Sequence, residues 1–260
     1  PHTILNGKPN IVAKYRAKYR PGNSTRNRCY LCQDATLLGD PQNHWAGNHH
    51  PHLAAMIESI DDGVGLILNK LKSLKLDQNT IVIFTSDNGG ETKVTSNAPL
   101  RGGKSQLYEG GIRVPLIVSW PDTIPSAGVS LQPTSNVDFY PTLLKAAKIP
   151  ANINHTIDGI SLLNTWKQSK SLSKRRALFW HYPLEKPHFL GGISSGAIRY
   201  GDWKLIERFN DNSIELYNLT KDPSETVNLA KKNPALKKVM LNQLIEWRKS
   251  FGATKKPPKR

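Results

Sequence analysis

Residues 80–90 have the sequence TIVIFTSDNGG, a short β-branched and apolar run that ends in an Asp-Asn pair and two glycines. A continuous apolar run of this length is typical of a strand that is covered on both faces. The preceding residues, 52–74, repeat apolar side chains every three or four positions, as an amphipathic helix does. Together they predict a helix followed by a buried parallel strand of an α/β sheet, and residues 114–120 predict a second such strand.

The pattern of predicted elements changes near residue 170. Before it, a helix is predicted from Asp138 to Leu144 and a short one from Asp158 to Trp166. After it, turn residues separate four short strand candidates, and a last amphipathic helix follows; these elements are 177–181, 195–200, 203–206, 214–217 and the helix 234–251. We therefore expect an α/β part in residues 1–170 and an α+β subdomain, with a small antiparallel sheet and a packed helix, in residues 171–260. Residues 1–50 are expected to be polar and irregular, with a solvated basic stretch at 14–20.

The composition limits the class of protein. The 260 residues carry 36 Lys+Arg against 20 Asp+Glu, a formal net charge of +16. This charge favours anionic partners without selecting nucleic acid, a membrane surface or a sulfated substrate. No apolar run approaches the ~20 residues of a membrane span, and we expect no signal sequence in this chain. Two cysteines, Cys29 and Cys32, are too few for a disulfide scaffold.

Asp87 and Asn88 are the first candidates for a functional site, because they follow a strand end, where open α/β sheets bind ligands. Their carboxylate and amide oxygens are hard donors that suit Ca²⁺ or Mg²⁺. Lys104 follows in LRGGK at 100–104, and a further glycine pair stands in YEGGIRVP at 108–115. A cation among glycines can hold an oxyanion beside a metal. Taken separately, these segments also fit a tight turn and a flexible basic loop.

Two other motifs suggest different chemistry and fit less well. Residues 103–105, Gly-Lys-Ser, match the end of a phosphate-binding P-loop, but Ala98 stands where its first glycine belongs and no strand leads directly into it. A spacing close to that of a zinc finger is formed by Cys29, Cys32, His44 and His49. The residues between them lack the apolar core of a finger, so a loop with incidental histidines is the preferred interpretation.

Several separate segments together resemble the sulfatase family, especially its bacterial arylsulfatase and glycan sulfatase branch. They are AMIESIDDGVG at 55–65, TIVIFTSDNGG at 80–90, SNAPLRGGKSQLYEGGIRVPLIVSWP at 96–121, LFWHYP at 178–183, AIRYGDWKLI at 197–206 and ELYNLTKDPSETVNLA at 215–230. They occur in the family's order and cover nearly all of the chain from residue 52. The match is therefore specific.

The resemblance implies an alkaline-phosphatase-like α/β sandwich, incomplete because its N-terminal strands are missing, with a C-terminal α+β subdomain. It implies that Asp87 and Asn88 are ligands of Ca²⁺, with Mg²⁺ as the alternative, and that Lys104 contacts the sulfate group. His2, in the opening Pro-His-Thr, resembles the catalytic histidine near the leaving oxygen. His181 in LFWHYP is a candidate substrate contact.

The sequence departs from the family pattern in one respect. Sulfatases use a Cys or Ser in a C/S-x-P-S-R motif, oxidised to formylglycine, as nucleophile, together with a pair of metal-binding aspartates near the N-terminus. No C/S-x-P-S-R motif occurs in the 260 residues, and Asp61 and Asp62 lie inside a predicted helix. We therefore expect the C-terminal half or more of a sulfatase, inactive by itself.

The activity implied by the resemblance is hydrolysis of a sulfate ester, with an aryl sulfate or a sulfated sugar or glycan as substrate and no specific nucleic acid partner. A periplasmic, secreted or lysosomal location is implied in the same way. The alternative is a non-catalytic basic module that binds sulfated polysaccharide or nucleic acid by charge alone. Such a module would show steep salt dependence without metal dependence.

Overall fold

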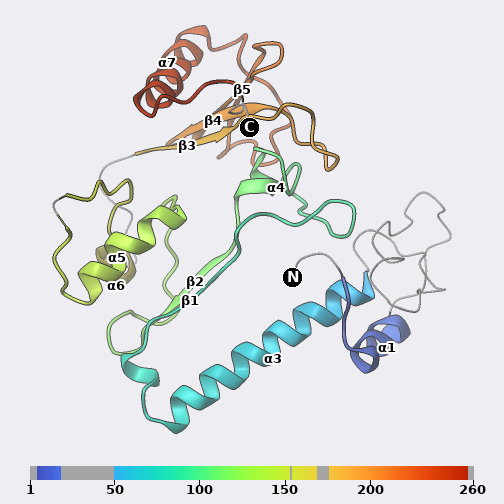
Figure 1. Cartoon of the computed structure of the whole chain (residues 1–260), viewed down its shortest axis with the longest axis vertical. Coiled ribbons are helices and arrows are strands. Elements are labelled where there is room, and N and C mark those ends of the chain that lie inside the picture. The colour runs from blue at the N-terminus through green and yellow to red at the C-terminus, as the bar shows by residue number, and fades with distance from the viewer. Residues whose placement is uncertain (1–4, 19–49, 153, 169–175, 257–260) are drawn as a thin grey trace. The chain divides into compact units, whose positions relative to one another are not determined.

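The computed structural model of the chain describes residues 5–18, 50–152, 154–168 and 176–256 (Figure 1). Its helices and two small sheets make an α/β protein. The chain forms two compact units, one of Pro1–Lys70, Ser86–Val114 and Phe179–Arg260, the other of Leu71–Thr85 and Pro115–Leu178. The segment with the candidate site residues thus belongs to the same unit as the C-terminal sheet, whereas the sequence suggested a division near residue 170.

Helix α1 (Pro9–Lys18) lies where the sequence analysis expected irregular structure, and for these residues the expectation was wrong. Proline is tolerated at the first helical position, because its missing N–H has no partner there in any helix. Ile11 and Val12 are buried in one cluster with Ala55, which belongs to helix α3 (Pro51–Ser73). Two buried apolar side chains in an otherwise polar and basic segment make a periodicity too weak to recognise.

The helix predicted over residues 52–74 is confirmed as α3. Its apolar stripe is only partly covered: Ile60, Ile67 and Leu68 are exposed. Neither α3 nor any other helix in the described ranges is long and apolar enough to cross a membrane.

Strands β1 (Val82–Thr85) and β2 (Leu116–Ser119) form a two-stranded antiparallel sheet. The prediction of buried, parallel strands was wrong on both counts, since Phe84 is 44% exposed. An apolar run does not encode the direction of the neighbouring strand. Thr85 lies opposite Leu116, so the connection leaves and re-enters the sheet at the same end, without the crossover that a parallel pair requires.

The buried side chain of Asp138 connects three segments of the second unit. Its fully buried carboxylate accepts hydrogen bonds from the backbone N–H groups of Ser135 and Ile160, each at 2.9 Å, and pairs with Arg176.

The short helices of this unit are η2 (Asp77–Asn79), η3 (Asn136–Asp138), α5 (Phe139–Ala146) and α6 (Leu163–Gln168). The helix predicted from Asp138 is confirmed, whereas the one predicted from residue 158 begins later, as α6.

The C-terminal sheet contains the four strands that the sequence predicted. They are β3 (Ala177–Tyr182), β4 (Ser195–Tyr200), β5 (Trp203–Arg208) and β6 (Ile214–Asn218), adjacent in that order. Strands β4, β5 and β6 pair antiparallel, as expected. Helix α7 (Pro234–Ser250) follows, in close agreement with the predicted last helix.

Different parts of the chain cover the two faces of this sheet (Figure 1). Alternation along β5 directs Glu207 to one face and Lys204 to the other. Helix α7 contacts β4 and β5 on the first face, where Arg248 and Glu207 form a buried ion pair at 2.9 Å. The second face meets the segment with helix α4 (Glu109–Ile112), whose Glu109 pairs with Lys204. The sheet therefore supports the segment that carries the candidate site.

Candidate active site

The candidate metal ligands follow β1 directly. The Ser86 hydroxyl donates a hydrogen bond to the carbonyl of Asn88 at 2.9 Å and lies 3.5 Å from Asp87 Oδ1, which tightens a turn at the strand end. The Asn88 side-chain NH₂ group donates to the carbonyl of Gly89 at 2.9 Å. The other end of the amide, Oδ1, can then coordinate a cation or accept a hydrogen bond from a ligand. Asp87 is exposed and Asn88 is half-buried, so a ligand can approach both side chains.

Backbone contacts between glycines hold this turn against the two glycine pairs that follow it in sequence. The N–H of Gly89 donates to the carbonyl of Gly111 at 2.9 Å. A Cβ at Gly89 would collide with the backbone of Gly110, and a Cβ at Gly103 would collide with the carbonyl of Gly90. Only glycine allows backbones to approach this closely. The glycines therefore bring together segments that are separated in the chain, with Gly89 against Gly110 and Gly111 and Gly90 against Gly103.

Asn97 joins the turn to the segment that carries Lys104. Its Oδ1 accepts from the N–H of Gly90 at 2.9 Å, and its Nδ2 donates to the carbonyls of Gly90 at 2.8 Å and Gly102 at 3.0 Å. The backbone N–H of Lys104 also donates to the Gly90 carbonyl, at 3.1 Å. Lys104 is thus fixed by its backbone next to Gly90, two residues after Asn88.

The side chain of Lys104 is half-buried. Within the part of the chain that the structure describes, no carboxylate pairs with its ammonium group. That the ammonium group shares one ligand with Asp87 and Asn88 stays a prediction, which the backbone junction at Gly90 supports.

A buried charge cluster anchors the end of the segment that carries Lys104. Lys204 Nζ lies 3.1 Å from Glu109 and 2.9 Å from Glu225, and all three side chains are at most 1% exposed. Arg199 lies 3.6 Å from the second oxygen of Glu109, so two cations face two carboxylates. Glu225 also accepts a hydrogen bond from the backbone N–H of Glu109 at 2.6 Å. Burial raises the pKa of Glu225, against the opposing effects of Lys204 and this N–H.

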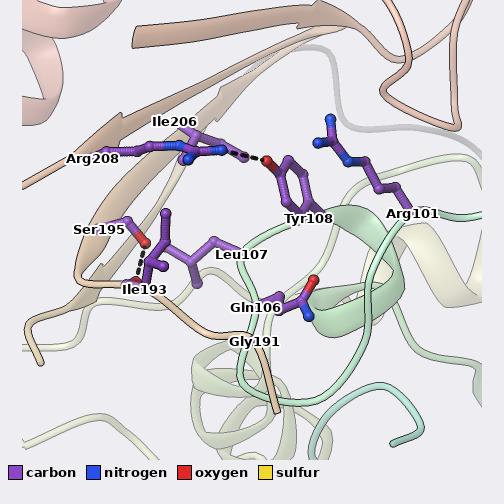
Figure 2. Close-up of a pocket in the computed structure, with 9 residues that line it drawn as sticks. All are labelled: Arg101, Gln106, Leu107, Tyr108, Gly191, Ile193, Ser195, Ile206 and Arg208. Carbon is purple, nitrogen blue, oxygen red and sulfur yellow. Dashed lines mark hydrogen bonds between the residues drawn. The ribbon is translucent and has the colours of Figure 1, made fainter. Parts of the chain in front are cut away.

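The start of the same segment is held by Arg101. Its guanidinium donates to the hydroxyl of Tyr217 at 3.1 Å and to the backbone carbonyl of Glu225 at 2.8 Å. It lies 4.0 Å from the ring centroid of Tyr108, within cation–π distance. Figure 2 shows Tyr108 between the guanidinium groups of Arg101 and Arg208. They border a cavity of about 220 Å³, whose other walls come from residues 106–107, from the segment 191–195 that leads into β4, and from Ile206 of β5.

Glu215 contacts two of the polar side chains that line this cavity, Tyr108 and Arg208. It accepts hydrogen bonds from the hydroxyls of Tyr108 at 2.8 Å and Tyr217 at 2.7 Å, and it pairs with Arg208. Burial raises the pKa of Glu215, but the two hydroxyls and Arg208 outweigh burial and bring the pKa below its ordinary value. Burial, together with Glu215, raises the pKa of Tyr217. The cavity is therefore bordered by groups that already bind one another.

His181 lies away from this segment, on β3. Its ring contacts Phe209 at a centroid distance of 5.4 Å, and the backbone of Thr254 and the side chains of Arg248 and Glu207 are its polar neighbours. Burial lowers the pKa of His181. Its assignment as a substrate contact stays a prediction. His2 lies outside the described residues, as do the four residues with zinc-finger-like spacing.

The candidate metal site, Asp87 and Asn88, has fewer ligands than Ca²⁺ requires. No three His, Cys, Asp or Glu side chains in the described ranges lie together so that they could hold a metal ion. Asp87 and Asn88 offer oxygens of the type that Ca²⁺ binds, whereas Ca²⁺ takes about 6–8 oxygen ligands. The pair therefore fits a calcium site chemically and would supply only part of its ligands, so its role as a metal site stays a prediction.

A profile of the sulfatase family matches residues 1–149, more than half of the chain. The chain belongs to the sulfatase family. A second profile, N-sulphoglucosamine sulphohydrolase, C-terminal, matches residues 103–250. Sulfatases generally depend on Ca²⁺ and on formylglycine.

Related sulfatases are longer than this chain. A sulfatase of Formosa agariphila is 37% identical over 216 residues, which are 75% of this chain and 39% of the relative. An N-acetylgalactosamine-6-O-sulfatase of Bacteroides thetaiotaomicron is 32% identical over 220 residues, 74% of this chain and 40% of the relative. The crystal structure of Ps i-CgsB in complex with k-i-k-neocarrahexaose has a TM-score of 0.74 at 27% identity, covering 95% of this chain and 48% of that one. This chain therefore spans less than half the length of each.

Sequence analysis did not identify three residues that support the site in this sulfatase chain: Asn97, Lys204 and Glu225. Lys204 had a recognisable signal, because a lysine inside the apolar run WKLI at 203–206 needs a partner if the strand is buried. Asn97 and Glu225 stand in polar segments next to prolines, where they look like ordinary turn residues. Their roles arise from contacts with distant segments.

Proposed function

We propose that this chain provides the sulfate-binding side of a sulfuric ester hydrolase that cleaves an aryl sulfate or a sulfated sugar or glycan. One observation carries the proposal. In a chain of the sulfatase family, a backbone junction at Gly90 joins the turn of Asp87 and Asn88 to Lys104, whose ammonium has no carboxylate partner among the described residues. This junction supports a site in which two oxygen donors and one cation act on the same ligand.

Each candidate residue has a distinct role in the proposal. Asp87 and Asn88 would hold a divalent cation, Ca²⁺ or Mg²⁺, which when bound polarises a sulfuryl oxygen. Lys104 neutralises negative charge on the transferring sulfuryl group, and its fixed backbone reduces the reorganisation needed during reaction. His2 donates a proton to the leaving oxygen, because an imidazole titrates near neutral pH. The incomplete alkaline-phosphatase-like sandwich is the fold proposed to hold these groups.

The nucleophile in this proposal comes from outside these 260 residues. They contain no C/S-x-P-S-R motif, and the family generally depends on formylglycine. Covalent catalysis requires an activated nucleophile, and charge stabilisation by the other groups does not replace the bond that the nucleophile forms. We therefore propose that these residues alone do not hydrolyse sulfate esters.

A sulfated glycan is the substrate class that the comparisons favour. Ps i-CgsB was crystallised with neocarrahexaose, and the Bacteroides relative is an N-acetylgalactosamine-6-O-sulfatase. A net charge of +16 suits a polyanionic glycan. We propose His181 as a further sugar contact, and a periplasmic, secreted or lysosomal location from family membership.

The test is an aryl-sulfate assay with added Ca²⁺, on this chain and on a version extended upstream of Pro1 and matured by a formylglycine-generating enzyme. We expect turnover only from the extended protein, and Lys104→Ala should lower that turnover by about 10²–10³-fold with little change in melting temperature. Lys93→Ala, which changes a nearby lysine whose ammonium lies 5.4 Å from the Phe189 ring, is the matched control. Lys104→Arg should rescue only partly, because a planar guanidinium differs from a compact ammonium.

Two outcomes would contradict the proposal. Ca²⁺-dependent turnover by this chain alone, at a rate comparable to the extended protein, would show that the nucleophile is among these residues. Binding of heparin and DNA with a steep salt dependence, unaffected by Ca²⁺ and by Lys104→Ala, would favour the basic binding module instead.

A further inference from the structure

One residue of the C-terminal subdomain contacts both ends of the loop that carries Lys104, defined here as residues 101–109. At the start of this loop, Arg101 donates from its guanidinium to the main-chain carbonyl of Glu225 at 2.8 Å. At its end, Glu109 donates from its backbone N–H to the Glu225 carboxylate at 2.6 Å. The loop is also closed by the residue that follows it, because the N–H of Gly110 donates to the Arg101 carbonyl at 2.8 Å.

The position of Glu225 is unusual for a residue in a polar turn segment. Its side chain is 0% exposed, and the carboxylate is compensated by Lys204, which is equally buried. A buried carboxylate destabilises a fold unless it is paired and hydrogen-bonded. Glu225 meets this requirement through a cation from β5 and an N–H from the loop, so loss of its carboxylate leaves the loop end without its acceptor.

We propose that Glu225 is a positioning residue for the sulfate site: by holding both ends of the 101–109 loop, it fixes Lys104 beside Asp87 and Asn88. This inference rests on the proposed role of Lys104 as the sulfate contact. Glu225 acts at the loop ends, whereas the bonds from Lys104 to Gly90 and from Asn97 to Gly102 act between them. With the ends and the middle fixed, the ammonium group is preorganised for an anion.

A matched residue, Glu207, allows a positioning role of Glu225 to be distinguished from a merely structural one. Glu207 is also a buried carboxylate, 3% exposed, and it pairs with Arg248 at 2.9 Å on the face of the same sheet that α7 covers. Glu225→Ala and Glu207→Ala each remove a buried carboxylate and leave a buried cation without that partner. Only Glu225 contacts the 101–109 loop through these bonds.

The experiment uses the full 260-residue chain and two measurements. Hydrogen exchange at the amides of Lys104, Gly110 and Gly111 reports on the loop, and titration with inorganic sulfate, with Lys104→Ala as the reference for lost binding, reports on the site. We expect Glu225→Ala to accelerate exchange at these amides at least about tenfold more than Glu207→Ala does, and to weaken sulfate binding by at least the same factor. A tenfold change is the effect of losing one charge-assisted hydrogen bond. If the alanine variants do not fold, Glu225→Gln and Glu207→Gln provide the same comparison with smaller changes.

The two measurements separate the possible failures. Equal changes in the Glu225 and Glu207 variants, or no change at the three amides, would overturn the positioning role. Faster exchange with unchanged sulfate affinity would also overturn it, because the loop would then be held without effect on the site. If the unaltered chain binds no sulfate, the proposed function of Lys104 fails, and the exchange comparison alone decides whether Glu225 holds the loop.

Discussion

Replacing Gly89 by alanine tests whether close backbone contact builds the candidate site. A Cβ at this position would lie well under the 3.0 Å that real Cβ contacts respect from the Gly110 carbonyl, so the two backbones must separate. The contact involves main-chain atoms on both sides, and no rotation of a side chain can relieve it. We therefore expect the turn of Asp87 and Asn88 to move away from the segment with Lys104.

The expected cost follows from two contributions. Forcing an extra carbon into a tightly packed region costs about 1–3 kcal/mol. Separation of the backbones also weakens the 2.9 Å hydrogen bond from the N–H of Gly89 to the carbonyl of Gly111, a net loss of about 0.5–1.5 kcal/mol. Together these predict a loss of about 1.5–4.5 kcal/mol in the free energy of unfolding. For a chain of this size the melting temperature should fall by about 3–18 °C.

The assay is thermal and urea unfolding followed by circular dichroism, with Gly63→Ala as the matched control. A Cβ at Gly63, inside α3, would have no atom within 4 Å. Because alanine favours the helix over glycine, this control should gain about 0.5–1 kcal/mol. The same chemical change is thus expected to have opposite signs at the two positions.

A Gly89→Ala variant as stable as the unaltered chain would refute the reasoning, since it would show that the turn and the Gly110 backbone do not touch in solution. So would a destabilised variant whose sulfate affinity is unchanged, because the two segments could then separate without effect on the site.

Two further predictions concern charge. Lys204→Met leaves two buried carboxylates without their shared cation and should lower the free energy of unfolding by about 3–5 kcal/mol. The control Lys249→Met changes a pair whose side chains are 68% and 70% exposed, and it should lower the free energy of unfolding by less than about 1 kcal/mol in the same assay. Similar losses in the two variants would contradict the burial argument. His181 has a lowered pKa in the folded chain, so the unfolded chain binds a proton first as pH falls below 6.5, and stability should fall in that range. His181→Gln should reduce the drop in melting temperature between about pH 7 and about pH 5.5, and an unchanged drop would exclude His181 as its source.

The sequence by itself determined the elements whose signal is local. The stripe of residues 52–74, the four short strands after residue 176 and the last helix all have apolar spacing that a single segment displays without its neighbours. Asp87 and Asn88 were predicted as ligands in the same local way, by chemical type at the end of an apolar run, and their role stays a prediction. Family motifs in a fixed order also need no tertiary information.

Only the tertiary structure decided which segments meet. The antiparallel pairing of β1 and β2 depends on where residues 86–115 re-enter the sheet, and an apolar run carries no record of this direction. Helix α1 has too few apolar residues to be recognised before Ala55 covers them. The contact between Glu109 and Glu225 joins residues 116 positions apart, and neither residue shows it locally. Local patterns follow from the backbone of one segment, whereas these contacts exist because burial leaves each polar group dependent on a partner that another segment supplies.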